Sequence, residues 1–255
     1  MRQQIPNFFT LSNLFCGCCS LVLLLNGEPV SAAWFTLGSF VCDYADGMAA
    51  RALGVSSPMG RELDSLADVV SFGVVPGMML YGMLTSIQCT SHAGWTGYPL
   101  SLALPSGPLP WCLAATPAFV LSMFSAYRLA KFNLDTRQKN YFIGLSTPGC
   151  TVFMLGLSLS AHRNLFGSGD FFMAQPWLAY ALIGLFSYLL VSEIPMFGMK
   201  IRSLRLRDNA FSLAFLAAFV LLVFFLKELA FSAVIVLYLI VSILLKNRIL
   251  SGEPI

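Results

Sequence analysis

Long apolar stretches, separated by short polar turns, run through almost the whole chain. A helix needs roughly 20 mostly apolar residues to cross the hydrocarbon core of a membrane. Segments of about this length lie at about 8–26, 31–53, 65–87, 111–131, 143–162, 176–195, 209–226 and 229–246. Barrel strands would instead be about 10 residues long and alternate in polarity. Because backbone polar groups in lipid must be hydrogen-bonded within the segment, the pattern predicts an all-α, polytopic membrane helical bundle with about eight transmembrane helices.

The composition agrees with an exterior that faces lipid. Hydrophobic residues make up 57% of the chain and charged residues only 11%, whereas a soluble domain carries about 25% charged residues. We expect one integral membrane domain over 1–255, with a catalytic core at about 5–195 and a C-terminal helical hairpin at about 209–246. Membrane lipids are the expected partners, contacted by the basic run at 200–207, and no nucleic-acid partner is expected.

The positions of the basic residues predict the orientation, because cytoplasmic loops carry an excess of Lys and Arg. With both termini placed in the cytoplasm, only Arg163 and Lys227 of the 15 Lys and Arg residues fall outside. The external loop at about 88–110 contains neither residue type. The distribution favours an integral protein of the cell (inner) membrane. Whether Cys89 and Cys112, which flank this loop, form a disulfide is left open by the sequence.

Four aspartates interrupt the apolar pattern at the cytoplasmic ends of the second and third segments. A charged residue at membrane depth costs roughly 2.5–3.5 kcal/mol and usually indicates a functional site. Asp43 and Asp46 are spaced i, i+3, and Asp64 and Asp68 are spaced i, i+4, so each pair shares one helix face. The intervening turn, rich in Gly, Ser and Pro, breaks the helix. Two adjacent helices can therefore direct all four carboxylates at one point, with Asp64 and Asp68 expected to open the third helix.

Four carboxylates in a confined site repel one another unless cations neutralise them. An oxygen-only set of ligands selects hard cations, so Mg²⁺ or Mn²⁺ is the expected cofactor. Two metal ions sharing these carboxylates would suit phosphoryl transfer, since they stabilise both the attacking and the leaving oxygen. Gly47 and Ala50 lie on the same helix face as Asp43 and leave room for a headgroup, although close helix packing is an equal alternative for Gly47.

The region resembles the CDP-alcohol phosphatidyltransferases at every fixed position of their signature. The match reads Asp43-x-x-Asp46-Gly47-x-x-Ala50-Arg51, eight residues, then Gly60-x-x-x-Asp64-x-x-x-Asp68. The resemblance implies that Asp43, Asp46 and Asp64 hold the metals and that Asp68 is both ligand and general base. It also implies that Gly47, Ala50, Arg51 and Gly60 bind the CDP-diacylglycerol, with Arg51 contacting phosphate.

Three further stretches resemble the phosphatidylserine synthases within this family. They are the segments at 5–17, at 64–77, and at 127–133 with its continuation at 141–148, whereas the last three spans match only in hydropathy and length. Two residues depart from the usual pattern: Lys131 replaces an Arg, and Ser146 replaces a Pro. The resemblance implies CDP-diacylglycerol and L-serine as substrates, and a homodimer as the common assembly.

Several polar residues near the aspartates are candidates for binding substrate. Thr10 and Asn13 would either reach the nucleotide or bond a neighbouring helix. Arg128 would bind the serine carboxylate or a phosphate, or else act as a cytoplasmic anchor, and Lys131 and Asn133 join it as acceptor-site candidates. The resemblance thus implies a metal-dependent phosphatidylserine synthase. The alternatives are the same chemistry on glycerol 3-phosphate or inositol phosphate and, remotely, a cation-coupled transporter.

Overall fold

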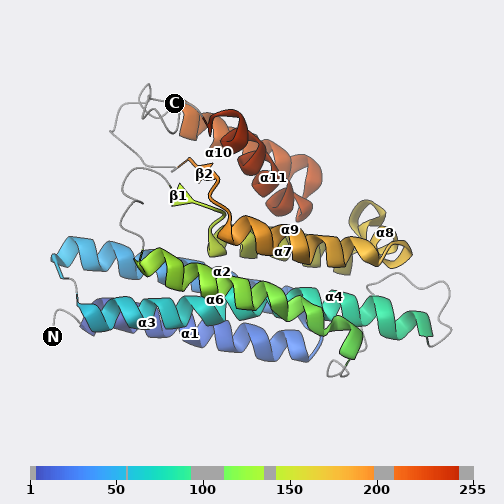
Figure 1. Cartoon of the computed structure of the whole chain (residues 1–255), viewed down its shortest axis with the longest axis horizontal. Coiled ribbons are helices and arrows are strands. Elements are labelled where there is room, and N and C mark those ends of the chain that lie inside the picture. The colour runs from blue at the N-terminus through green and yellow to red at the C-terminus, as the bar shows by residue number, and fades with distance from the viewer. Residues whose placement is uncertain (1–3, 56, 93–111, 135–141, 198–209, 247–255) are drawn as a thin grey trace.

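A computed structural model describes residues 4–55, 57–92, 112–134, 142–197 and 210–246, and a helix occupies each of the eight predicted segments. Most of the long helices run side by side along one direction (Figure 1). The elements in chain order are α1 (Gln4–Leu25), α2 (Pro29–Leu53), α3 (Pro58–Asp68), the π-helix η1 (Val69–Val74), α4 (Val75–His92), the 3-10 helix η2 (Leu113–Ala118), α6 (Phe119–Leu134), β1 (Phe142–Ile143), α7 (Thr147–His162), the 3-10 helix η3 (Leu165–Gly167), α8 (Ser168–Ala174), α9 (Trp177–Val191), β2 (Pro195–Met196), α10 (Ala210–Leu226) and α11 (Leu229–Leu244).

Among the described residues, three helices are long and apolar enough to cross a membrane. They are Gln4–Leu25, the continuous helix Pro58–Gln88, and Leu113–Leu134. A bent pair, Leu165–Phe172 with Trp177–Val191, raises the number to four if it is one span. The helical fold with three or four candidate membrane spans is therefore confirmed, while membrane crossing by all eight segments stays a prediction.

The turn between α2 and α3 forms as its composition predicts. Gly54 ends α2 in the left-handed region at φ 61°, and its N–H bonds the carbonyls of the last helical turn. Ser57 then caps α3 by accepting from the N–H of Gly60 at 2.9 Å, and Pro58 takes the first helical position. Because of this cap the helix begins seven residues earlier than the predicted start at 65. Asp64 and Asp68 consequently lie inside α3 rather than at its beginning.

Directly after Asp68 the helix widens into the π-helix η1 before continuing as α4. Widening leaves carbonyls without their usual partners, and such segments are common at functional sites. Hydroxyl groups from neighbouring helices supply the bonds: Thr151 of α7 donates to the carbonyl of Phe72 at 3.2 Å, and Ser122 of α6 donates to that of Gly73 at 2.8 Å. The π-helix is therefore buried in its middle and hydrogen-bonded to both α6 and α7.

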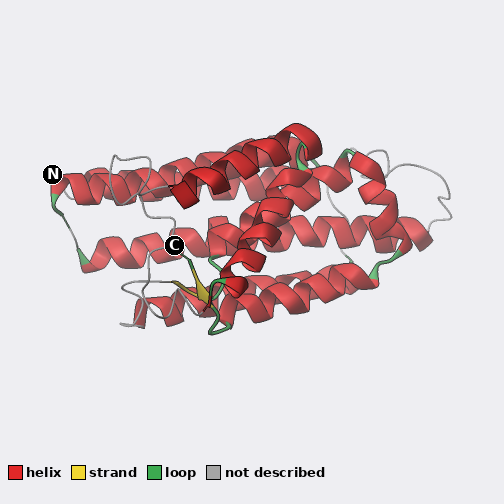
Figure 2. Ribbon diagram, turned by 90° about the horizontal axis from the view of Figure 1, so that it is seen from above, coloured by secondary structure: helices red, strands yellow, loops and turns green. Residues whose placement is uncertain are grey.

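The C-terminal part of the chain packs across the main bundle. Viewed from above, α10 and α11 cross the parallel helices at an angle (Figure 2), and α11 packs mainly on α7. Helix α9 ends at Val191 rather than near the predicted 195, since the backbone is extended from Ser192 and Pro195 disfavours helix before it. The freed segment forms β2, which pairs antiparallel with β1 through Phe142↔Met196 and Ile143↔Pro195.

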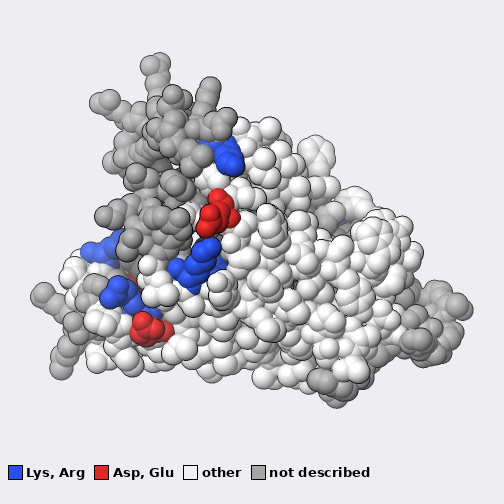
Figure 3. Space-filling view, in the orientation of Figure 1, with Lys and Arg blue, Asp and Glu red and all other residues white. Residues whose placement is uncertain are grey.

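Charged side chains occupy only part of the surface. In Figure 3 the visible Lys, Arg, Asp and Glu side chains gather towards one end of the molecule, and most of the remaining described surface on that face is uncharged. Large apolar side chains such as Trp34, Leu113 and Phe224 are more than two-thirds exposed. An apolar exterior of this kind fits lipid as the surrounding solvent.

Candidate active site

Three of the four signature aspartates converge on one point. Asp43 of α2 and Asp64 and Asp68 of α3 each offer a carboxylate oxygen, and these oxygens all lie within 4.8 Å of one another. The helical spacing explains the arrangement, because each helix turns its acidic face towards the other. One oxygen of Asp64 is buried and has no hydrogen-bond partner in the described structure. Like charges this close, with an orphaned buried oxygen, fit a bound divalent cation.

Asp46 lies beside this group without belonging to it. Its side chain is buried and accepts a hydrogen bond from the hydroxyl of Thr10 on α1 at 2.7 Å. The two side chains also line the same cavity, next to Asp64. The sequence places all four aspartates at one site, and the structure divides them into a group of three and a fourth that Thr10 orients.

A cavity of about 150 Å³ opens beside Asp46 and Asp64, between α1, α2 and the start of α3. The described residues that line it combine small, polar and acidic side chains. They are Pro6, Asn7, Thr10, Asp46, Gly47, Ala50, Val55, Ser57, Gly60, Arg61 and Asp64. Four predicted binding residues, Thr10, Gly47, Ala50 and Gly60, are therefore brought together in one cavity.

The glycines of the signature keep this cavity open. A Cβ at Gly60 would stand 3.0 Å from Ser57 Oγ and 3.3 Å from the side-chain oxygen of Asn7, so a larger residue would crowd both. Arg51 is exposed, and its guanidinium lies 4.0 Å from where a Cβ of Gly47 would be. It lies next to the cavity rather than in its lining.

The sequence did not make Asn7 or Arg61 a binding residue, and Arg61 was expected only to neutralise part of the charge of the aspartates, yet both line the cavity. Asn7 approaches Gly60 from α1, and Arg61 brings a cation to the wall that Asp64 shares. The signal for both was present, since Asn7 lies in the stretch at 5–17 and Arg61 directly follows a signature glycine. The sequence alone does not show that the N-terminus of α1 approaches the turn between α2 and α3.

Asn13 occupies a different position from Thr10. Its side chain is fully buried at 0% exposure, and its amide donates to Asp68 Oδ1 at 3.2 Å. It is not among the described residues that line the cavity. Of the two alternatives left open by the sequence, the structure gives Asn13 a bond to a neighbouring helix.

Arg128 of α6 is a buried cation close to the acidic group. Only 7% of the residue is exposed, its Nε has no hydrogen-bond partner in the described structure, and its guanidinium lies 5.6 Å from the ring centre of Phe132. It interacts electrostatically with Asp68. Arg128 also lines a second cavity, of about 10 Å³, between the ends of α6 and α9. A buried guanidinium with an unused donor is suited to an anionic group.

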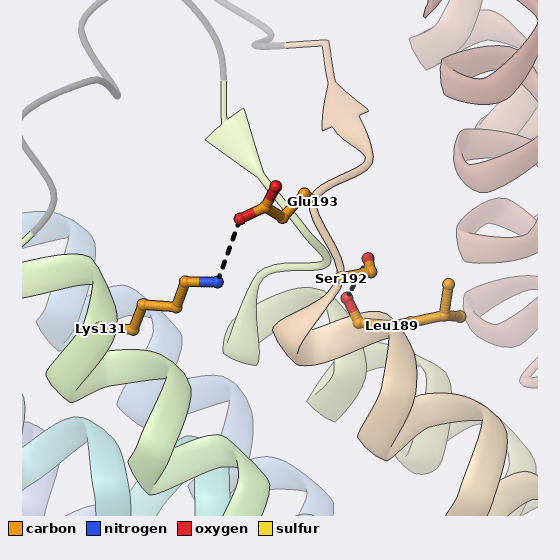
Figure 4. Close-up of polar contacts among 4 residues, drawn as sticks. All are labelled: Lys131, Leu189, Ser192 and Glu193. Carbon is orange, nitrogen blue, oxygen red and sulfur yellow. Dashed lines mark hydrogen bonds and ion pairs between the residues drawn. The ribbon is translucent and has the colours of Figure 1, made fainter.

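The other two acceptor-site candidates lie further out. Lys131 lines the second cavity, and its Nζ lies 3.8 Å from Glu193 Oε1 on the segment that joins α9 to β2 (Figure 4). Ser192, beside Glu193, also lines that cavity and donates to the carbonyl of Leu189 at 2.9 Å. Asn133 is exposed and donates to Ser65 Oγ of α3 at 2.8 Å, away from both cavities.

Two remaining sequence features have simple structural outcomes. Ser146, the departure from a usual Pro, caps α7 by accepting from the N–H of Gly149 at 3.1 Å, a bond that Pro has no side-chain oxygen to make. Cys112 is a free, buried cysteine, and the side chain of Cys89 lies outside the described residues.

The fold and the site define a helical membrane protein with an acidic group able to hold a metal ion beside a polar cavity. Comparison with known proteins gives the family: a model of the CDP-alcohol phosphatidyltransferases matches residues 3–188. The chain belongs to this family and is an enzyme of the phosphatidyltransferase class. The match ends before β2, so α10 and α11 lie outside it.

Individual relatives agree on one activity. The CDP-diacylglycerol–serine O-phosphatidyltransferase of Bacillus subtilis is 34% identical over 192 residues, covering 75% of this chain and 89% of the relative. The protein of the same name from Mycobacterium leprae is 30% identical over 247 residues, covering 93% and 72%. That from Helicobacter pylori is 30% identical over 241 residues, covering 94% and 89%.

Proposed function

We propose that the protein transfers the phosphatidyl group of CDP-diacylglycerol to the hydroxyl of L-serine and releases CMP. The observation that carries the proposal is the group of Asp43, Asp64 and Asp68 beside a cavity whose lining includes the signature residues Asp46, Gly47, Ala50 and Gly60. The names of the relatives supply the acceptor, since each is a serine O-phosphatidyltransferase.

Asp43, Asp64 and Asp68 would hold a divalent cation, Mg²⁺ or Mn²⁺, and Asp46 would help hold a second. Bound there, the metal would neutralise the carboxylates and the diphosphate, and so favour charge development on the leaving oxygen. The close approach of the carboxylates and the orphaned oxygen of Asp64 support this assignment. Thr10 would keep one oxygen of Asp46 in a fixed direction.

The cavity between α1, α2 and α3 would bind the CDP portion of the donor. Thr10, Gly47, Ala50 and Gly60 line it. Arg51, next to Gly47, would contact a phosphate from the cavity edge. The acyl chains would stay in lipid, because the described exterior of the helices is apolar.

Asp68 would act as the general base for the acceptor. It would take the proton of the serine hydroxyl as that oxygen attacks the β-phosphorus, which bears the diacylglycerol. The new bond joins the serine oxygen to phosphorus, and the bond from phosphorus to the CMP oxygen breaks. The products are phosphatidylserine and CMP. Two observations support this role: Asp68 belongs to the acidic group, and it interacts electrostatically with Arg128.

Arg128 and Lys131 would bind the serine carboxylate. Both line the second cavity, and Arg128 carries an unused buried donor. A volume of about 10 Å³ holds no more than about one water molecule, so the ends of α6 and α9 would have to separate for serine to enter. We assign Asn133 to the contact between α6 and α3, in view of its bond to Ser65.

The proposal includes the arrangement in the membrane. All eight helices would cross the cell (inner) membrane with both termini in the cytoplasm, and the aspartates would face that side. The charge distribution of the sequence supports this orientation. We also propose a single membrane domain over 1–255 with a catalytic core at about 5–195, and a homodimer, the assembly that the family resemblance supports.

The deciding experiment measures transfer from CDP-diacylglycerol in purified membranes with Mn²⁺ or Mg²⁺. Labelled L-serine, glycerol 3-phosphate and inositol phosphate are compared as acceptors, each with and without a chelator. We expect metal-dependent product from serine alone. Product from a phosphorylated acceptor instead would refute the serine assignment and leave the family assignment intact.

A further inference from the structure

Asn13 of α1 is hydrogen-bonded to residues of α2, α3 and η1. Its side-chain amide donates to Asp68 Oδ1 at 3.2 Å. Its backbone carbonyl accepts two hydroxyl bonds, from Ser39 of α2 at 3.2 Å and from Ser71 of η1 at 3.1 Å. All of Asn13, Ser39 and Ser71 are 0% exposed. A buried polar group is costly unless it is bonded, so these contacts hold α1, α2 and η1 at one point.

Gly17, one turn after Asn13, makes this junction possible. A Cβ at Gly17 would stand 2.4 Å from Ser71 Oγ and 3.1 Å from Ser71 Cα. The absence of a side chain at this position therefore lets η1 lie directly against α1. The π-helix in turn delivers Ser71, three residues after Asp68, to the carbonyl of Asn13.

Asn13 and Thr10 differ in their position relative to the donor cavity. Thr10 lies one turn earlier on α1, lines the donor cavity and bonds Asp46. Asn13 bonds the carboxylate that the proposed function makes the base, and it is absent from the described lining of the cavity. Two neighbouring polar residues on one helix thus contact two different aspartates.

We propose that Asn13 is a positioning residue for Asp68. Its amide occupies Oδ1 and fixes the rotation of the carboxylate about its χ2 torsion, so that the other oxygen is presented to the reacting hydroxyl. The serine pair and Gly17 keep the backbone of Asn13 in place for this contact. The inference rests on the proposed function only in that Asp68 receives the proton, and it holds for whichever acceptor the enzyme uses.

The test compares Asn13→Ala with Thr10→Val, a matched variant on the same helix. Steady-state kinetics give kcat and the KM for CDP-diacylglycerol, using the acceptor that wild type accepts. Binding of CDP-diacylglycerol without turnover is measured separately, from the thermal shift it produces in detergent. Removing a residue that orients an active-site ligand typically costs about 10- to 100-fold. We expect a kcat loss of that size for Asn13→Ala, with the KM and the thermal shift close to wild type.

Thr10→Val should differ by raising the KM and reducing the thermal shift, because Thr10 lines the donor cavity, in addition to any kcat loss caused by losing its bond to Asp46. A raised KM for Asn13→Ala with unchanged kcat would make Asn13 a donor-binding residue and overturn the proposal. Wild-type kinetics for Asn13→Ala would overturn it as well.

If Asn13→Ala does not accumulate in membranes, Ser71→Ala provides a second test. It removes one of the two bonds to the Asn13 carbonyl while leaving the side-chain amide of Asn13 intact. It must then lower kcat selectively, and unchanged kcat in that variant also overturns the proposal. Failure of wild type to use serine would refute the proposed function without affecting this comparison.

Discussion

Helices α7 and α11 approach so closely at Gly156 that the smallest possible side chain should disturb them. A Cβ at this position would stand 2.6 Å from the backbone nitrogen of Ser232 and 2.8 Å from Phe231 Cβ. The Ser232 hydroxyl also donates to the carbonyl of Phe153 at 2.7 Å across the same contact. Because one of the atoms in the way belongs to the backbone, rotation of a side chain cannot relieve the clash. Gly156→Ala should therefore push α11 away from α7.

The size of the effect follows from two opposing contributions. Overpacking of a tight contact costs about 1–3 kcal/mol, and Gly→Ala in a helix gains up to about 1 kcal/mol in propensity. Gly184 of α9 supplies the matched control, since nothing lies within 4 Å of its Cβ position. Gly184→Ala gains the propensity without the clash, so the difference between the two variants isolates the packing cost.

Thermal unfolding of both variants in the same detergent measures this difference. A change of 1 kcal/mol shifts the Tm of a chain of this size by roughly 2–4 °C. We expect Gly156→Ala to melt about 2–12 °C below Gly184→Ala. Equal melting temperatures would show that α7 and α11 are not in the contact described, and the reasoning would fail.

Two predictions concern the site. Asp68→Asn should abolish turnover because the amide cannot accept the hydroxyl proton, while the thermal shift produced by CDP-diacylglycerol remains; measurable full activity would exclude Asp68 as the base. Lys131→Met should raise the KM for serine by removing a cation from the second cavity, yet change the stability by no more than about 1 kcal/mol, since Lys131 and Glu193 form an exposed ion pair. Glu193→Gln breaks the same pair but keeps the cation, so an equal rise in KM there would contradict the role of Lys131.

Local pattern was enough to predict the elements and the acidic group. Helical spacing put Asp43 on one face, and Asp64 with Asp68 on another, and the Gly and Pro residues of the turn brought the two helices together. These features depend on residues close in the chain, which is where spacing arguments are strongest. The helix ends were less accurate, because the cap at Ser57 begins α3 seven residues before the apolar run at 65.

Long-range contacts could not be predicted in the same way. The bond from Asn13 to Asp68 joins residues 55 positions apart, and the pair of Lys131 with Glu193 depends on how α9 ends. The π-helix has no local signal either, since the run at 69–74 reads as ordinary apolar helix. Two of its carbonyls, those of Gly73 and Phe72, accept hydroxyl bonds from α6 and α7. Such features follow from packing between segments, which one sequence does not contain.

The π-helix lets the chain hold one additional residue between the aspartates of α3 and helix α4. A π-helix contains one residue more than the α-helix that would replace it. Deleting one residue of Val69–Val74 would permit a regular helix in which α3 and α4 keep nearly the same relative rotation, because the wider turn takes up the additional residue. The aspartates would then keep their direction, whereas a residue deleted from the regular helix α4 would rotate them by about 100° relative to the rest of that helix. In this family member, selection on the active site should therefore act more strongly against single-codon deletions in α4 than against those within Val69–Val74.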